Sequence, residues 1–206
     1  MDIGAHKGAY LYWMSRAVTP SGQVFAFEPQ LALATYLKAR VEELALHATV
    51  ENLALSDASG TALLDVPAGG PACGATLEPG LEGEKTSVQV EVRTLDGYFA
   101  SRPGIRIALV KCDAEGHELR IFRGAERVLR EHRPVLLFEC EARHNRRQSI
   151  ADVFGFLQSL GYRGHLFAQG KLAGLDQFRP EMQADPHSRG YVNNFVFLPD
   201  PASPIG

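Results

Sequence analysis

Acidic side chains stand at the ends of several strand-like segments of this sequence, and they are the residues best placed to do chemistry. Short apolar runs end at or beside Asp2, Glu28, Asp113, Glu139 and Glu141. In a sheet of parallel strands, ligands bind beyond the carboxyl ends of the strands. We therefore expect these carboxylates to gather along one edge, where they could hold a polar ligand or take a proton from a hydroxyl.

The opening residues MDIGAHKG hold a glycine loop of the form D-x-G-x-x-x-G, between a strand stub and a helix. Glycines in such a loop let the backbone approach a ligand with φ values that other residues avoid. A dinucleotide-binding loop would read G-x-G-x-x-G and would place a helix N-terminus on a pyrophosphate. This loop lacks the middle glycine and has Asp2 before its first glycine. It therefore suits an amine better than a phosphate.

Glu28 ends the second expected strand, 24 residues after Gly4. A carboxylate at this position can accept hydrogen bonds from both hydroxyls of a ribose. A ligand with a ribose, an amine and no phosphate points to S-adenosylmethionine. Taken alone, the glycine loop is equally compatible with a purely structural turn, and the combination with Glu28 favours the cofactor.

The run KCDAEGHE (residues 111–118) places several reactive side chains close together. Asp113 ends a strand that is expected to lie beside the first strand. It should therefore lie near the methyl group of S-adenosylmethionine. Three interpretations stay open. Asp113 or His117 is a general base for a substrate hydroxyl; Asp113, Glu115 and Glu139 bind a divalent cation such as Mg²⁺, which acidifies that hydroxyl; or Glu115 and Glu118 cap the next helix.

Strand-like and helical segments alternate along the chain, which predicts an α/β fold with a doubly wound, mostly parallel sheet. We expect strands within 23–29, 48–57, 61–67, 87–95, 105–113, 134–141 and 193–199, a hairpin within 163–175 turning at Gly170, and helices within 9–18, 30–46, 119–132 and 149–162. Residues 1–200 are expected to form a single domain, and residues 201–206 a loose tail.

A stretch rich in Gly and Pro separates segments 61–67 and 87–95, which we expect to pair as an antiparallel hairpin because the second alternates apolar and polar residues. This stretch, residues 67–86, is predicted to be a long loop. Loops of this length are uncommon in compact domains unless they are functional or disordered. A lid over the substrate and a merely mobile loop are the two alternatives.

The chain resembles the FkbM-type S-adenosylmethionine-dependent methyltransferases in five motifs that follow in the family's order, namely DIGAHKG, FAFEP, ALSD, VKCDAEGHE and LLFECE. The most specific of them is K-x-D-x-E-G-x-E. The resemblance implies a class I methyltransferase fold, with a Rossmann-like, seven-stranded sheet that has one antiparallel strand. It also implies O-methylation of a hydroxyl on a sugar or secondary-metabolite small molecule.

The resemblance assigns roles to individual residues. The implied cofactor-binding residues are Asp2, Gly4, Ala5, Gly8, Glu28, Asn52, Ser56 and Asp113. The glycine loop would hold the methionine side of the cofactor, Glu28 the ribose, and the segment from Asn52 to Ser56 would border the adenine. The candidate catalytic residues are Asp113, His117 and Glu139, and the substrate pocket would use Glu139, Glu141 and His144.

The family's pattern has a full strand before the glycine loop, whereas here that strand is reduced to MDI. We therefore expect a truncated first strand and missing upstream residues. This feature favours one alternative function, a non-catalytic binding protein on a degenerate methyltransferase scaffold. The other alternative is a nicotinamide-dependent oxidoreductase, against which the missing middle glycine argues.

Composition narrows the expected partners. The 206 residues carry a formal net charge of −3, so no broad basic field is available for nucleic acid or anionic lipid. The one basic cluster, residues 143–148, is expected to be a solvated loop or helix start. No apolar stretch reaches the ~20 residues of a membrane helix. We expect a small-molecule hydroxyl acceptor as the partner, and a homo-oligomer stays open.

Cysteine usage indicates the compartment. Cys73, Cys112 and Cys140 are an odd number at wide spacing, which argues against disulfides and for a reducing, cytoplasmic location. Cys112 and Cys140 end apolar runs and are expected to be small core residues.

Overall fold

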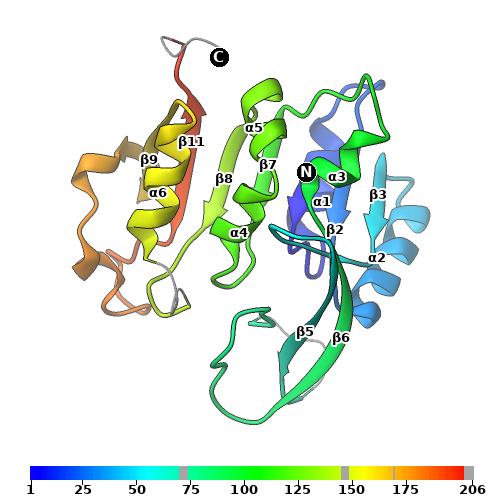
Figure 1. Ribbon diagram of the computed structural model, residues 1–206, viewed down its shortest axis with the longest axis horizontal. Helices are drawn as coiled ribbons and strands as arrows, with labels where there is room; N and C mark the ends of the chain where they lie inside the picture. Colours follow the sequence, from blue (N-terminus) through cyan, green and yellow to red (C-terminus); the bar gives the residue numbers. More distant parts are fainter. Residues whose placement is uncertain (70–73, 145–148, 169, 202–206) are drawn as a thin grey trace.

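The computed structural model describes residues 1–69, 74–144, 149–168 and 170–201, so Cys73 and the expected tail after residue 201 lie outside the described part (Figure 1). Eight strands form the central sheet, and in sheet order they are β10 (Lys171–Gly174), β9 (Tyr162–Ala168), β11 (Asn194–Pro199), β8 (Val135–Glu139), β7 (Leu109–Cys112), β1 (Asp2–Ile3), β2 (Val24–Phe27) and β3 (Ala48–Glu51).

The sheet is mostly parallel, as the alternation of segments predicts. Strand β1 pairs in parallel with β2 and β7, β2 with β3, and β7 with β8. Strand β11 runs antiparallel to β8 and β9, and β10 runs antiparallel to β9. The expectation of seven strands with one antiparallel is therefore wrong. Both strands of the predicted 163–175 hairpin enter the sheet, because β10 pairs with the otherwise open edge of β9.

A second sheet has the order β4 (Ala54–Leu55), β6 (Lys85–Arg93) and β5 (Gly60–Pro67). Strands β5 and β6 form the predicted antiparallel hairpin, and β4 adds a short parallel pairing with β6. Figure 1 shows this hairpin projecting from the body of the molecule. The loop between β5 and β6 is thereby brought to one end of the central sheet.

Helices cover both faces of the central sheet. They are α1 (Ala9–Ala17), α2 (Leu31–Glu43), α3 (Leu95–Ala100), α4 (Glu118–Arg123), α5 (Glu126–His132) and α6 (Ile150–Ser159), with the 3₁₀ helices η1 (Leu175–Gln177) and η2 (Pro180–Gln183). One buried cluster joins α1 and α2 to Ala26, while Phe25 and Phe27 of the same strand join the cluster under α3 to α6. The two-residue period of β2 thus separates two cores, as a doubly wound fold requires.

Two helix predictions need correction. The helix expected over 119–132 is two helices, because the chain turns at Gly124, where a Cβ atom would lie 2.0 Å from the Ser56 carbonyl oxygen. Helix α2 ends at Glu43, before the end of the predicted range 30–46, and Leu44 just after it is 47% exposed. Among the described residues, no helix is long and apolar enough to cross a membrane.

We expect Gly124→Ala to destabilise the protein by about 1–3 kcal/mol, because the added methyl group meets backbone and the chain must shift. The matched control is Gly155→Ala in α6, where an added Cβ has no neighbour within 4 Å. This control should stabilise the protein by roughly 0.5–1 kcal/mol through helix propensity. Urea unfolding of both variants measures the difference, and equal free energies of unfolding would contradict the close contact at Gly124.

The core fixes the tips of β7 and β8. Phe138 of β8 makes ring contacts with Phe122, Phe154, Phe195 and Phe197. The side chains that precede the strand tips are therefore immobilised by packing. Cys112 and Cys140 are 0% and 1% exposed, which confirms them as core residues.

Candidate active site

A cleft opens at the carboxyl ends of β1, β2 and β7. Its cavity volume is about 130 Å³, and about 740 Å³ when the space of the open mouth is included. Of the predicted site residues, the cleft brings together Gly4, Glu28, Asp113 and His117. Apolar side chains form most of its wall, among them Ile3, Phe27, Leu53, Leu55, Leu64, Leu77 and Ile121.

The glycine loop packs tightly against the neighbouring strands. Gly4 has φ +73°, and a Cβ atom there would lie 1.9 Å from the Asp113 carbonyl oxygen. The amides of Gly4 and Ala5 donate to the Phe27 carbonyl at 3.0 and 3.2 Å. Gly8, with φ +84°, is the N-cap of α1. The first glycine therefore serves the close approach of β1 to β7, and Ala5 and Gly8 shape the loop without lining the cleft.

Glu28 links two loops at the tip of β2. Its side chain is 3% exposed and accepts hydrogen bonds from the His6 amide at 2.8 Å and the Gln30 amide at 2.9 Å. Burial raises the pKa of this carboxyl, while the two amides oppose the rise. Each carboxylate oxygen has a further lone pair, so the group can still accept from a ligand in the cleft.

Asp2 does not line the cleft. Its carboxyl is buried, and one of its oxygens, Oδ2, has no hydrogen-bond partner within the described part of the chain. Burial raises the pKa of Asp2 to about 6, opposed by the nearby Lys111 ammonium. Asp2 is also close enough for its charge to raise the pKa of Glu28. Its influence on the cleft is therefore electrostatic, and its direct contact with a ligand stays a prediction.

Asp113 follows β7 and lines the cleft. Its amide donates to the Ile3 carbonyl at 3.0 Å, and its carboxylate lies 3.2 Å from the Lys111 ammonium. The Lys111 side chain is only 3% exposed, whereas that of Asp113 is 34% exposed. A buried cation thus holds a carboxylate that remains open to a ligand.

The sequence profile of the FkbM methyltransferase domain matches residues 2–163, more than half of the chain. The chain belongs to the FkbM methyltransferase family. The five motifs noted in the sequence lie within the matched range, and Gly4, Glu28 and Asp113 of these motifs meet in the cleft.

Several solved structures are similar to this chain. An FkbM methyltransferase from Methylobacillus flagellatus KT is similar over 96% of this chain and 42% of its own, with a TM-score of 0.59 and 19% identity. A SAM-dependent O-methyltransferase from Thermotoga maritima is similar over 98% of this chain and 59% of its own, with a TM-score of 0.45 and 13% identity. The first likeness shows the fold, and the chain spans less than two thirds of either structure. No curated protein matches the chain.

In this FkbM domain, the two residues predicted to border the adenine bond to protein groups. Asn52 donates to the carbonyls of Glu28 and Pro29, both at 3.0 Å, and so holds the turn after β2. The Ser56 hydroxyl donates to Asp57 and lies 2.9 Å from His117 Nε2. Neither residue lines the main cleft, and their contact with adenine stays a prediction.

His117 lines the cleft, but both of its ring nitrogens have protein partners. Nδ1 lies 2.7 Å from Glu78 Oε1, and Nε2 lies 2.9 Å from the Ser56 hydroxyl. The side chain is 3% exposed. These contacts suit a residue that holds its neighbours better than one that takes a proton from a substrate.

Neither Glu115 nor Glu118 caps α4, although Glu118 lies in its first turn. Glu118 Oε1 accepts from the amides of Ala114 at 3.0 Å and Gly116 at 3.2 Å, which closes the loop before α4. Burial raises the pKa of Glu118 to about 7. Glu115 instead lies 2.8 Å from His144 and accepts from the Gly74 amide at 3.1 Å.

A second acidic group follows β8. Glu141 is buried and accepts from the Tyr191 hydroxyl at 2.7 Å and the Asn193 amide at 2.8 Å, and it pairs with Arg143. Sequence reasoning missed Tyr191 and Asn193. The polar residues just before the last strand were the available signal, because antiparallel pairing of β11 with β8 brings them to Glu139.

Glu139 shares a hydrogen bond with Glu141. Burial, this hydrogen bond and the charge of Asp113 raise the pKa of Glu139. The pKa of Glu141 is lowered by its hydrogen bonds, chiefly from Arg143, against the effect of burial. The proton of the pair therefore resides on Glu139, and the negative charge resides on Glu141.

We expect the stability of the wild type to fall as pH rises from the unfolded-state pKa of glutamate, ~4.3, through the raised folded pKa of Glu139. The folded protein binds the extra proton in that window, so deprotonation removes stability. Glu139→Gln keeps a donor toward Glu141 and should lose this part of the pH dependence. Thermal unfolding of both proteins across the window measures it, and parallel curves would contradict a protonated Glu139.

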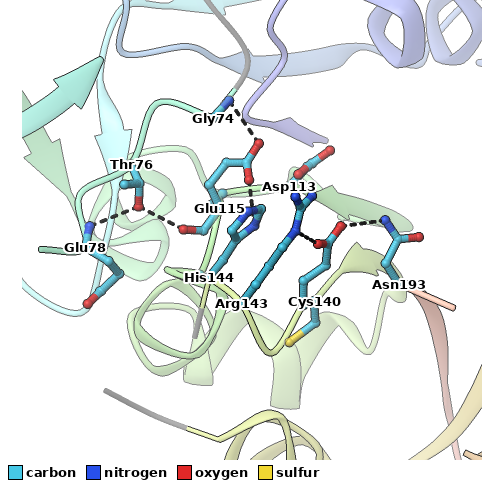
Figure 2. A network of polar contacts seen from close by, with 12 residues as sticks. Gly74, Thr76, Glu78, Asp113, Glu115, Cys140, Arg143, His144 and Asn193 are labelled. Atoms are coloured by element: carbon cyan, nitrogen blue, oxygen red, sulfur yellow. Dashed lines mark hydrogen bonds and ion pairs between the residues drawn. The ribbon is translucent and has the colours of Figure 1, made fainter. Parts of the chain in front are cut away.

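The predicted metal-binding set is not assembled. Within the described ranges, no three His, Cys, Asp or Glu side chains gather as a group that could hold a metal ion. The carboxylate of Glu115 instead bonds to the Gly74 amide and to His144 (Figure 2). In the basic cluster at 143–148, Arg143 and His144 lie in a turn, as expected of a solvated loop, and pair with Glu141 and Glu115; residues 145–148 lie outside the described part.

Proposed function

We propose that this chain binds S-adenosylmethionine and methylates a hydroxyl of a small molecule, such as a sugar or a secondary metabolite. The observation that carries the proposal is the buried Glu28 carboxylate, which shares one cleft with Gly4 and Asp113. Membership in the FkbM methyltransferase family supports the reaction class.

The residues of the cleft fit this cofactor. Glu28 is an acceptor with no cationic partner among the residues that the structure describes, which suits ribose hydroxyls and opposes a phosphate. Phe27, Leu53 and Leu55 offer an apolar wall for the adenine. Asp113 is a carboxylate suited to the positively charged end of the ligand. When bound, the cofactor supplies a methyl group on a cationic sulfur.

Two carboxyl groups of this chain can handle the proton of the acceptor hydroxyl. An alcohol is a weak nucleophile and needs a base. Asp113 accepts that proton, because its carboxylate is fixed by Lys111 and open to the cleft. Glu139, at the tip of the next strand, is kept neutral by Glu141 and offers an acceptor oxygen without a second charge beside Asp113.

Calorimetric titration with S-adenosylhomocysteine and, separately, with NADH tests the cofactor. We expect saturable heat with S-adenosylhomocysteine and none with NADH. Heat with NADH alone would support the oxidoreductase, and no heat with either would support a non-catalytic scaffold.

A radiolabelled methyl donor offered with a panel of hydroxylated and aminated small molecules then tests the acceptor. We expect labelled methyl ethers of hydroxyl compounds. Transfer to amines alone would overturn the hydroxyl assignment.

A further inference from the structure

Glu115 joins three segments that are distant in the sequence. Its Oε1 accepts from the Gly74 amide at 3.1 Å, its Oε2 lies 2.8 Å from His144 Nδ1, and its carbonyl accepts from the Thr76 hydroxyl at 2.8 Å. Figure 2 shows the Glu115 side chain between Gly74 and His144. The β5–β6 loop, the loop before α4 and the loop after β8 therefore meet at one side chain.

The backbone at this point is unusual. Glu115 has φ +51°, in the left-handed region that side chains rarely adopt, and Gly116 follows with φ +95°. A Cβ atom at residue 116 would lie 2.4 Å from the His144 carbonyl oxygen. Such a conformation persists only where its surroundings hold it, and it clusters at functional sites. Here it turns the Glu115 carboxylate toward the β5–β6 loop.

The segment that Glu115 holds, residues 74–78, forms part of the cleft wall. Gly74, Ala75 and Leu77 line the cleft, and Thr76 and Glu78 are each 8% exposed. A second contact fixes the far end of the segment, since Glu78 bonds to His117 at 2.7 Å. Both attachments use residues of the run KCDAEGHE, which also carries Asp113.

The contacts of Glu115 are of a kind that holds loops together. A carboxylate that accepts an amide hydrogen bond makes a stronger bond than a neutral acceptor does. Glu115 combines this bond with its contact to His144, whose pKa it raises. Glu115 is thus committed to holding loops together and is not available as the metal ligand or helix cap considered from the sequence.

We propose that Glu115 is a positioning residue that clamps residues 74–78 over the cofactor cleft, so that a ligand leaves only when this segment lifts. The inference rests on the proposed function, because it takes the occupant of the cleft to be S-adenosylmethionine or its product. It assigns to Glu115 control of the lifetime of the bound ligand.

Hydrogen exchange of the ligand-free protein tests the clamp without any cofactor. We expect Glu115→Ala to speed exchange in the peptide covering 74–78 by at least about tenfold, because the Gly74 amide loses its charged acceptor. Glu115→Gln keeps an acceptor for this amide and should restore much of the protection. The matched control is Glu84→Ala, an exposed glutamate before β6. Unchanged exchange in Glu115→Ala would overturn the proposal.

Stopped-flow dissociation of S-adenosylhomocysteine tests whether Glu115 controls the lifetime of the bound ligand. We expect Glu115→Ala to release this product about tenfold faster than the wild type and Glu84→Ala to release it at the wild-type rate. Thr76→Val removes the hydroxyl that bonds the Glu115 carbonyl and decides the matter if Glu115→Ala does not fold. Release at the wild-type rate from folded Glu115→Ala and Thr76→Val would overturn the clamp. Absence of binding to the wild type would instead overturn the proposed function, and hydrogen exchange would still decide the clamp.

Discussion

Asp113→Asn should lower the rate of methyl transfer by about 10²–10⁴-fold while leaving the affinity for S-adenosylhomocysteine nearly unchanged. Asparagine has nearly the same shape but cannot take up a proton. Asp113 follows β7 in the cleft, its carboxylate lies 3.2 Å from a buried lysine, and a third of its side chain is open. Initial rates with an acceptor from the hydroxyl panel, together with calorimetry, separate turnover from binding.

The control for this experiment is Asp176→Asn, which changes an exposed aspartate of η1. It should retain the wild-type rate. If Asp113→Asn also kept that rate, Asp113 would not be the base, and Glu139 would become the carboxyl to examine. A parallel loss of cofactor affinity would instead indicate that Asp113 mainly holds the ligand.

Glu28→Ala should weaken binding of S-adenosylhomocysteine by about 10–150-fold. A hydrogen bond to a charged group contributes ~1.5–3 kcal/mol, and each 1.4 kcal/mol is a factor of ten in affinity. The substitution removes the acceptor for the ribose and also leaves the amides of His6 and Gln30 without their carboxylate. Calorimetry of the variant measures the loss.

Glu43→Ala is the matched control, because Glu43 lies at the exposed end of α2 and pairs only with Arg40 among the described contacts. Its affinity for S-adenosylhomocysteine should equal that of the wild type. Circular dichroism should show both variants folded. An unchanged affinity in folded Glu28→Ala would remove Glu28 from the ribose site.

Local patterns were sufficient to predict the strand tips. The apolar runs that end at Glu28 and Asp113 are buried strands of a parallel sheet, and such strands place their carboxyl ends at a common edge. The glycine loop was located from its spacing, but its first glycine was expected to let a ligand approach, and the close contact with Asp113 was not predicted. The position of the cleft, and of Gly4, Glu28 and Asp113 in it, therefore followed from sequence periodicity and motif spacing.

Contacts between distant segments were not predictable in the same way. The break at Gly124 depends on Ser56, and the role of Glu115 depends on Gly74, 41 positions away. The sequence of a helical segment does not reveal which loop will pack against it.

A crystal structure of the protein with S-adenosylhomocysteine tests the central claim most directly. The account predicts the ribose hydroxyls on the Glu28 carboxylate, the sulfur beside Asp113, and residues 74–78 closed over the ligand. A ligand bound elsewhere, or a ribose without contact to Glu28, would contradict it.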